Sequence, residues 1–282
     1  MKLLRYGPVG AEKPGCLDAD GAIRDLSSVT GDFMGNAVSL RAIASLKTVD
    51  LASLPLVEAD VRLGAALADV PNFYCIGQNY AKHALESGAE PPTEPILFNK
   101  SSTALSGPND TVILPKDTTK GDWEVELGVV IGTDVSYVSE AEALDCVSAY
   151  CVVNDVSERA FQLERGGTWT KGKSAPTFGP VGPWLVTADE VADPQALSLW
   201  LKLNGQTMQS SNTSDMIFGV AEIISYMSRF MALKAGDIIA TGTPEGVGMG
   251  QKPQRFLQEG DEMELGIDGL GVQKQAVVAL AS

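Results

Sequence analysis

Two glutamates, Glu124 and Glu126, stand one residue apart in the apolar stretch GDWEVELGVVIG at residues 121–132. Side chains alternate between the two faces of a strand, so we expect both carboxylates to project from the same face. Like charges that close repel each other, and burying them unpaired is costly. Either open water or a bound cation must offset that cost. A glutamate pair on a strand more often marks a solvated sheet face, but this strand continues without polar alternation.

A third carboxylate follows the same pattern. Asp155 ends the apolar run AYCVVND, so it also stands at the end of a predicted buried strand. Three acids at the ends or inner faces of buried strands suit a hard divalent cation with oxygen ligands. The chain has one histidine, His83, which excludes zinc sites built from two or three histidines. Mg²⁺, Mn²⁺ or Ca²⁺ is therefore the predicted metal, with open positions for water and a chelating substrate.

His83 lies three residues before Glu86 in GQNYAKHALESG, so on a helix the two side chains share a face. Glu86 could orient the imidazole and raise its basicity, which would make His83 a general base. An ordinary charged pair on a surface helix explains the same spacing, and for this motif alone it is the more frequent case. Glycines at both ends of the stretch fit a mobile lid over a site.

The stretch GTWTKGKS, from Gly167 to Ser174, matches the phosphate-binding pattern G-x-x-x-x-G-K-S/T letter for letter. Such a loop needs an apolar strand before it and a helix after it. No strand precedes it, and the prolines and glycines of APTFGPVGP forbid an immediate helix. We therefore reject a nucleotide site and keep Lys171 and Lys173 as candidate cations near a substrate.

Three further polar side chains are candidates for substrate contact. Thr243 lies in the loop TGTPEGVGMG, whose glycines allow close backbone approach to a ligand, and its hydroxyl could hydrogen-bond a carboxylate. Arg159 and Gln162 follow Asp155 closely in the sequence. They could bind polar groups of a substrate, or they could simply be exposed to solvent.

The composition limits the classes of partner. The chain of 282 residues has 36 Asp and Glu against 21 Lys and Arg, a net charge of -15, which argues against nucleic acid or an anionic membrane. Its four cysteines form no C-x-x-C pair, and we interpret them as ordinary buried thiols in a reducing cytosol. Neither a signal-peptide core nor an apolar run of transmembrane length occurs in the sequence, so we expect a cytoplasmic protein.

The elements that must position these side chains are mostly strands. Residues 1–70 are predicted to form a small N-terminal β-rich domain, and residues 71–282 a catalytic domain. Strand and helix signals alternate too irregularly for a doubly wound sheet, so the predicted class is α+β and β-rich. Asx-Gly pairs predict hairpin turns at Asp20-Gly21, Asn204-Gly205 and Asp268-Gly269.

Three helices are predicted from local signals. A capping box at Ser139 and Glu142 opens one of them. The stretch 214–230 has helical spacing with Ser214 as its cap. The third is the short helix that carries His83, which Gly88 should end.

Six stretches, in this order, resemble the fumarylacetoacetate hydrolase family. They are YCIGQNYAKHALESG, PILFNKSSTALSGPND, DWEVELGVVIG, YCVVNDVSERAFQ, TKGKSAPTFGPVGPW and IIATGTPEGVG, and they lie within residues 73–248. The resemblance implies a mixed β-sandwich roll with a small N-terminal β-rich domain, a Mg²⁺ or Mn²⁺ site and a homodimer. The N-terminal module and GPWLVTADEV are similar to the bacterial branch that contains 2,4-diketo-3-deoxy-sugar-acid hydrolases.

The resemblance also implies a role for each candidate residue. The implied reaction is hydrolysis of the C3–C4 bond of a 2,4-dioxo acid, an acylpyruvate of the 2,4-diketo-3-deoxy-L-fuconate or rhamnonate type, to pyruvate and a second acid. The family's pattern places its metal ligands on Glu124, Glu126 and Asp155, its water-activating pair on His83 and Glu86, its active-site lysine on Lys173, and its substrate contacts on Arg159, Gln162 and Thr243.

Other functions stay open at the level of the sequence. The same scaffold could carry an oxaloacetate decarboxylase, a hydratase or isomerase of 2-oxo-enoic acids, or a ureidoglycolate lyase. Each would act on a small-molecule acid. The remaining alternative is a non-enzymatic β domain that binds a small molecule and carries the three acids on a solvated face.

Overall fold

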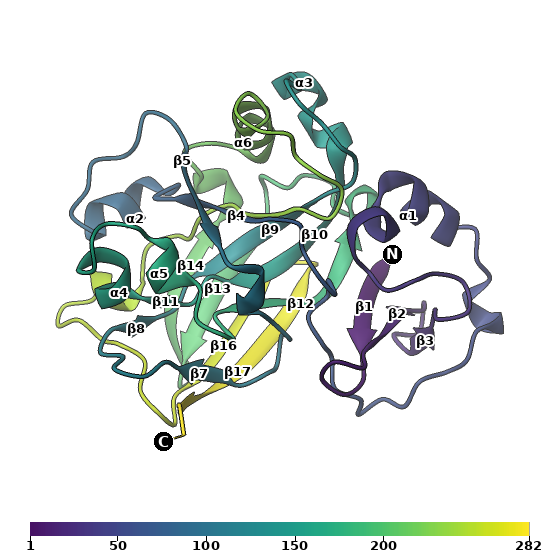
Figure 1. Ribbon diagram of the computed structural model, residues 1–282, viewed down its shortest axis with the longest axis horizontal. Helices are drawn as coiled ribbons and strands as arrows, with labels where there is room; N and C mark the ends of the chain where they lie inside the picture. Colours follow the sequence, from purple (N-terminus) through teal and green to yellow (C-terminus); the bar gives the residue numbers. More distant parts are fainter. Residues whose placement is uncertain (282) are drawn as a thin grey trace.

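The computed structural model describes residues 1–281 and contains two β-sheets that pack against each other, with short helices around them (Figure 1). The larger sheet has the strand order β3-β2-β1-β12-β10-β9-β15-β4-β5, and β6 pairs with β12 outside this path. The second sheet has the order β14-β13-β16-β17-β7, while β8 and β11 form a separate two-stranded ladder.

The strands are β1 (Lys2–Tyr6), β2 (Lys13–Leu17), β3 (Ile23–Asp25), β4 (Phe73–Gly77), β5 (Ile96–Lys100), β6 (Leu105–Ser106), β7 (Val112–Leu114), β8 (Gly121–Asp122), β9 (Val125–Ile131), β10 (Val147–Asn154), β11 (Ser157–Glu158), β12 (Gly179–Thr187), β13 (Ser198–Leu203), β14 (Gln206–Asn212), β15 (Ile238–Ala240), β16 (Glu262–Ile267) and β17 (Gly271–Ala279). The α-helices are α1 (Leu40–Leu46), α2 (Ala81–Glu86), α3 (Glu140–Ala143), α4 (Arg159–Leu163), α5 (Thr170–Lys173) and α6 (Val220–Met227). Short 3₁₀ helices are η1 (Gly35–Val38), η2 (Leu51–Ser53), η3 (Ser102–Ala104), η4 (Leu144–Cys146), η5 (Ala188–Glu190), η6 (Thr213–Asp215) and η7 (Gly248–Gly250).

Burial on both faces explains the apolar sequence of β9. Leu127 and Val129 contribute to the core between the two sheets, whereas Val130 packs with N-terminal residues on the opposite face. In Figure 1 the N-terminal strands and α1 lie at one end of the molecule, and α2, α4 and α5 gather at the other. The larger sheet is therefore covered on both faces, as its unbroken apolar strands require.

The three predicted acids occupy neighbouring ends of β9 and β10. Glu126 lies opposite Val153 in the antiparallel ladder, and the Asp155 N–H donates to the Glu124 carbonyl just beyond it. The predicted strand over residues 121–132 is interrupted, because β8 pairs with β11 and β9 begins only at Val125. Glu124 therefore stands in the short gap between β8 and β9 rather than inside a strand.

The predicted hairpins are confirmed by the strands on either side of each turn. At the turn between β13 and β14, Asn204 has φ of 51° and Gly205 has φ of 79°. Two consecutive left-handed residues match the twist of the flanking strands, which is why Asn-Gly is favoured at this position.

The predicted helix over residues 214–230 is wrong in its extent. Helix α6 begins at Val220, and Ser214 lies in the separate turn η6. The N–H groups of Ile217 and Phe218 donate to the carbonyl and side-chain oxygens of Asn79, so they are not available to a helix. A contact across 139 residues thus overrides the local helical pattern.

The predicted capping box also differs from the structure. The Ser139 hydroxyl donates to the Glu142 carboxylate at 2.6 Å, and its side chain makes no capping bond to the helix. Helix α3 ends at Ala143, and the chain enters β10 at Val147. The burial of β10 on both faces favours the strand over a longer helix.

The fold class is confirmed as mixed and β-rich, with antiparallel and parallel pairs in both sheets. β1 pairs with β12, so the N-terminal strands extend the larger sheet. The division of the chain at residue 70 stays a prediction. Among residues 1–281, none of the helices has the length and apolar character needed to cross a membrane.

Candidate active site

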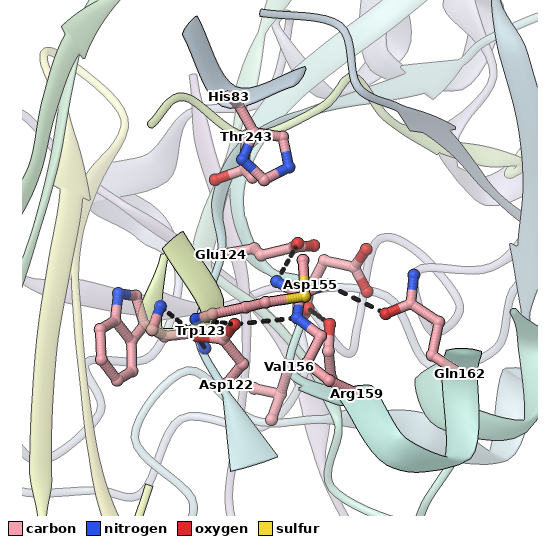
Figure 2. A network of polar contacts seen from close by, with 12 residues as sticks. His83, Asp122, Trp123, Glu124, Asp155, Val156, Arg159, Gln162 and Thr243 are labelled. Atoms are coloured by element: carbon pink, nitrogen blue, oxygen red, sulfur yellow. Dashed lines mark hydrogen bonds and ion pairs between the residues drawn. The ribbon is translucent and has the colours of Figure 1, made fainter. Parts of the chain in front are cut away.

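The carboxylates of Glu124, Glu126 and Asp155 converge at the ends of β9 and β10. One oxygen from each lies within 4.8 Å of the others, and the three residues are at most 4% exposed. Figure 2 shows Glu124 and Asp155 beside Arg159, below His83. These acids are not on a solvated face, so open water does not offset their charge.

Positive side chains offset part of that charge, which the sequence pattern did not reveal. The Lys173 ammonium bridges two acids, at 2.6 Å from Glu124 Oε2 and 2.7 Å from Asp155 Oδ2. Arg159 donates to Glu124 Oε1 at 2.6 Å and to Asp122 Oδ2 at 2.8 Å. The expectation that water or a metal alone must compensate the glutamates is therefore corrected.

Lys100 is a further cation of the site that the sequence analysis missed. Its side chain is fully buried at the end of β5, and its ammonium lies 2.5 Å from Asp155 Oδ1 and 3.1 Å from the Val156 carbonyl. Both oxygens of Asp155 thus accept from a lysine. Four buried acids, including Asp122, face three buried cations, which leaves one excess negative charge.

Glu126 is the fourth of these acids and the one left over by the pairing. The Gly242 N–H donates to it at 2.8 Å, and no cationic side chain of residues 1–281 forms an ion pair with it. Burial raises the pKa of Glu126 well above its usual range, and Asp155 and Glu124 raise it further. Burial also acts to raise the pKa of Glu124, but Arg159 and Lys173 outweigh it and hold this pKa below its usual range.

The donor set fits a hard divalent cation. All three groups offer carboxylate oxygens, which Mg²⁺ and Mn²⁺ accept, and sulfur or imidazole is absent from the cluster. A divalent ion would change the site's charge from one negative to one positive, which suits an anionic substrate. The structure fits a metal here, and metal ligation by these residues remains a prediction.

His83 and Glu86 form a pair on α2. His83 Nδ1 lies 2.9 Å from Glu86 Oε1, and the Gly246 N–H donates to the same carboxylate at 2.9 and 3.1 Å. An Nδ1–H that donates to Glu86 leaves Nε2 as the ring nitrogen that accepts a proton. Gly88, with φ of 78°, follows the end of the helix as predicted.

The loop that anchors Glu86 is tied to the acid cluster. The N–H groups of Gly248 and Met249 donate to Asp122, which also receives Arg159 Nε. The Trp123 indole donates to the Gly246 carbonyl at 3.1 Å. Asp122 and Trp123 hold this loop in place, and their position directly before Glu124 in GDWEVE was the only sequence signal for that role.

A cavity of about 90 Å³ separates the acids from α2, whereas one water needs roughly 10–15 Å³. Gln162 accepts from Arg159 at 3.1 Å, and the Thr243 hydroxyl donates to the Val125 carbonyl and accepts from Gln209. Lys171 lies outside this cavity and contacts the backbone carbonyl of Arg165. The site candidates that line it are His83, Glu124, Glu126, Arg159, Gln162, Lys173 and Thr243.

The family model for the fumarylacetoacetate hydrolase C-terminal domain matches residues 72–278. The chain belongs to the fumarylacetoacetate hydrolase family. The resemblance found in the sequence is thereby confirmed.

Relatives of this fumarylacetoacetate hydrolase family member extend over its full length. A Burkholderia ambifaria protein is 56% identical over 98% of each chain. Its name assigns it provisionally as a hydrolase and states no substrate. The solved fumarylacetoacetate hydrolase of Exiguobacterium antarcticum is 35% identical, with a TM-score of 0.86 over 99% of this chain and 100% of that one.

Two further solved structures extend over the whole of both chains. Maleylpyruvate hydrolase from Sphingobium sp. SYK-6, in complex with manganese(II) and pyruvate, is 30% identical with a TM-score of 0.82. A 2-hydroxyhepta-2,4-diene-1,7-dioate isomerase from Mycobacterium marinum is 31% identical with a TM-score of 0.79. The protein thus belongs to an enzyme family whose named members include hydrolases and isomerases of small molecules.

Proposed function

We propose that the protein is a divalent-metal-dependent hydrolase that cleaves the C3–C4 bond of a 2,4-dioxo acid to give pyruvate and a second acid. One observation carries the proposal: two of the three clustered acids, Glu124 and Glu126, line one cavity together with Lys173 and His83, whose ring is paired with Glu86. The manganese and pyruvate named for the Sphingobium relative support both the metal and the product. We extend the proposal to a sugar-acid substrate of the 2,4-diketo-3-deoxy type.

Glu124, Glu126 and Asp155 would hold Mg²⁺ or Mn²⁺. When bound, the ion would supply Lewis-acid stabilisation of negative charge that develops on the substrate's 2-oxo oxygen. Lys173 lies between two of these acids and would add a second positive charge at the same place. Arg159 holds Glu124 in position and offers Gln162 a donor, so the amide nitrogen of Gln162 is left for the substrate.

The His83–Glu86 pair would provide the base. His83 Nε2 takes a proton from water, and the hydroxide adds to the C4 carbonyl. Collapse of the tetrahedral adduct breaks the C3–C4 bond, and the bonding electron pair moves into a pyruvate enolate. The proton on His83 then goes to C3. One water is consumed, and the products are pyruvate and the acid derived from C4.

An isomerase is the second candidate, because a relative of 31% identity carries that name. Isomerisation would use His83 as a proton shuttle and would need no attacking water. The two functions differ in product, since only the hydrolase releases pyruvate.

The proposal is tested by incubating the protein with Mg²⁺ or Mn²⁺ and a panel of 2,4-dioxo acids, oxaloacetate and 2-oxo-enoic acids, and measuring pyruvate. We expect pyruvate from 2,4-dioxo acids, and a loss of at least ~10²-fold in His83→Ala with metal binding retained. Pyruvate from oxaloacetate alone would indicate a decarboxylase instead. A shift in the absorbance of 2-oxo-enoic acids without pyruvate would indicate an isomerase.

Three further proposals concern the protein as a whole. We propose a homodimer, which light scattering after size exclusion would detect as twice the chain mass of 29.7 kDa. We propose a cytoplasmic location and a separate N-terminal domain over residues 1–70. Fractionation of cells and limited proteolysis near residue 70 test these two statements.

A further inference from the structure

Two polar side chains of the cavity have no part in the proposed mechanism. Gln78 lies just before α2 and Ser87 just after it, and both line the cavity with His83. Neither is a member of the acid cluster or of the His83–Glu86 pair. Their position at both ends of the helix that carries the base makes them candidates for recognising the substrate.

The Ser87 hydroxyl is an unpaired buried group. Its Oγ is one of four buried side-chain atoms without a hydrogen-bond partner in residues 1–281, and of these four residues only Ser87 lines the cavity. A buried hydroxyl without a partner costs about 1–3 kcal/mol. A ligand group in the cavity that pairs with this hydroxyl would remove that cost.

The backbone conformation of Gln78 is also unusual. Its φ of 53° is left-handed, which is uncommon for a residue other than glycine. Such strain gathers at ligand sites, where the surrounding structure holds it in place. Gln78, whose side-chain amide can both donate and accept, lines the cavity together with Ser87.

The position of Ser87 indicates which part of the substrate it meets. Ser87 follows His83 by four residues, and its N–H donates to the His83 carbonyl, so the two side chains lie on one face of α2. In the proposed function His83 activates the water that adds to the C4 carbonyl. The acyl chain beyond C4 would therefore lie along this face of α2. The cations that line the cavity, Arg159 and Lys173, are already paired with acids, so a charged tail would find no free partner there.

We propose that Ser87 and Gln78 form a subsite for an uncharged hydroxyl group on the acyl chain of the substrate, next to the cleaved bond. This inference rests on the proposed acylpyruvate hydrolase function and selects hydroxyacyl pyruvates over alkyl or carboxyalkyl ones. A serine hydroxyl and a glutamine amide can each donate to and accept from such a group. A substrate that lacks it leaves the Ser87 hydroxyl unpaired in the complex.

The test compares kcat/KM for three acylpyruvates of equal chain length, whose acyl chains are hydroxylated, unsubstituted, or end in a carboxylate. We expect the hydroxylated compound to exceed both others by about 10- to 100-fold in the wild type. Ser87→Ala should bring the ratio of hydroxylated to unsubstituted close to one, and Ser87→Thr, which keeps the hydroxyl, should restore it. Ser45→Ala, on the exposed side of α1, is the control that keeps the wild-type ratio.

Failure of this inference is distinct from failure of the proposed function. If no acylpyruvate is cleaved, the hydrolase itself is wrong. If all three are cleaved equally well, or if Ser87→Ala keeps the preference, the subsite is wrong. Tm gives a readout without substrate: Ser87→Ala should melt at or above the wild-type temperature, because an unpaired hydroxyl is removed. A Tm lower by several degrees would reveal a structural partner and overturn the proposal.

Discussion

Gly250 is predicted to keep the catalytic pair in place simply by lacking a side chain. A Cβ built at Gly250 would lie 2.4 Å from Glu86 Oε2 and 2.5 Å from its Cδ, where ordinary contact begins near 3.4 Å. The carboxylate would have to move by about 1 Å, since 3.4 minus 2.4 is 1.0. The clash is with the end of a side chain, so Glu86 shifts while the backbone remains.

A shift of that size removes the contacts that define the pair. It breaks the hydrogen bonds that Glu86 accepts from Gly246 and the 2.9 Å contact with His83 Nδ1. Displacement of a catalytic group by 1 Å can lower a rate by about 10²-fold. The lost hydrogen bonds should lower the free energy of unfolding by about 1–3 kcal/mol. For a chain of this length, each kcal/mol corresponds to roughly 2–4 °C in Tm.

The assay measures kcat for pyruvate release and Mn²⁺ affinity for Gly250→Ala, Glu86→Ala and the double variant. We expect each single change to reduce kcat by about 10²-fold, the double change to lose no more than Glu86→Ala alone, and Mn²⁺ affinity to stay at the wild-type value. Gly31→Ala is the matched control, because a Cβ there meets nothing within 4 Å. An unchanged kcat in Gly250→Ala, or a loss that adds to that of Glu86→Ala, would refute the reasoning.

Two further predictions concern the charges of the acid cluster. In metal-free protein the pKa of Glu126 is raised, so its ionisation destabilises the fold as pH rises. Glu126→Gln should therefore increase the free energy of unfolding at pH 7. This advantage should disappear below the unfolded-state pKa of about 4.3. Urea unfolding at pH 7 and pH 3.5 checks this prediction, and a variant less stable than the wild type at pH 7 would contradict it. Calorimetry should also show that Glu126→Gln binds Mn²⁺ at least ~10-fold more weakly. Lys100→Met should destabilise the protein by about 3–5 kcal/mol, because Asp155 loses a buried partner. The unpaired negative charge that remains on Asp155 should tighten Mn²⁺ binding and raise KM for an anionic substrate. The exposed control Lys116→Met should show neither effect. A loss of affinity for both Mn²⁺ and the substrate would show that Lys100 only supports the fold.

Local signals predicted the features that depend on local physics. The hairpin at Asn204-Gly205 follows from the conformational freedom of those two residues, which no distant contact has to supply. The convergence of Glu124, Glu126 and Asp155 follows from two apolar runs, because β9 begins beside the two glutamates and the antiparallel β10 ends just before Asp155. The strand order could not be derived in this way, because it depends on pairings between distant parts of the chain, such as β1 with β12.

The missed features all involve contacts between distant segments. Lys100 ends a short strand, where a lysine is usually solvated, and only the approach of Asp155 from 55 residues away turns it into a buried cation. Asn79 diverts the chain before α6 in the same way. These buried cations also correct the expectation that water or a metal must balance the acids, because they pair with three of the four buried acids and leave Glu126 without a cationic partner in residues 1–281.

The central claim is that the three carboxylates hold a divalent cation beside the His83–Glu86 pair. The most direct measurement is anomalous diffraction from crystals grown with Mn²⁺ and pyruvate. We predict one strong anomalous peak per chain among Glu124, Glu126 and Asp155, with pyruvate next to it on the side of the cavity that His83 lines. No peak at this cluster at saturating Mn²⁺, or a peak elsewhere with pyruvate beside it, would contradict the account.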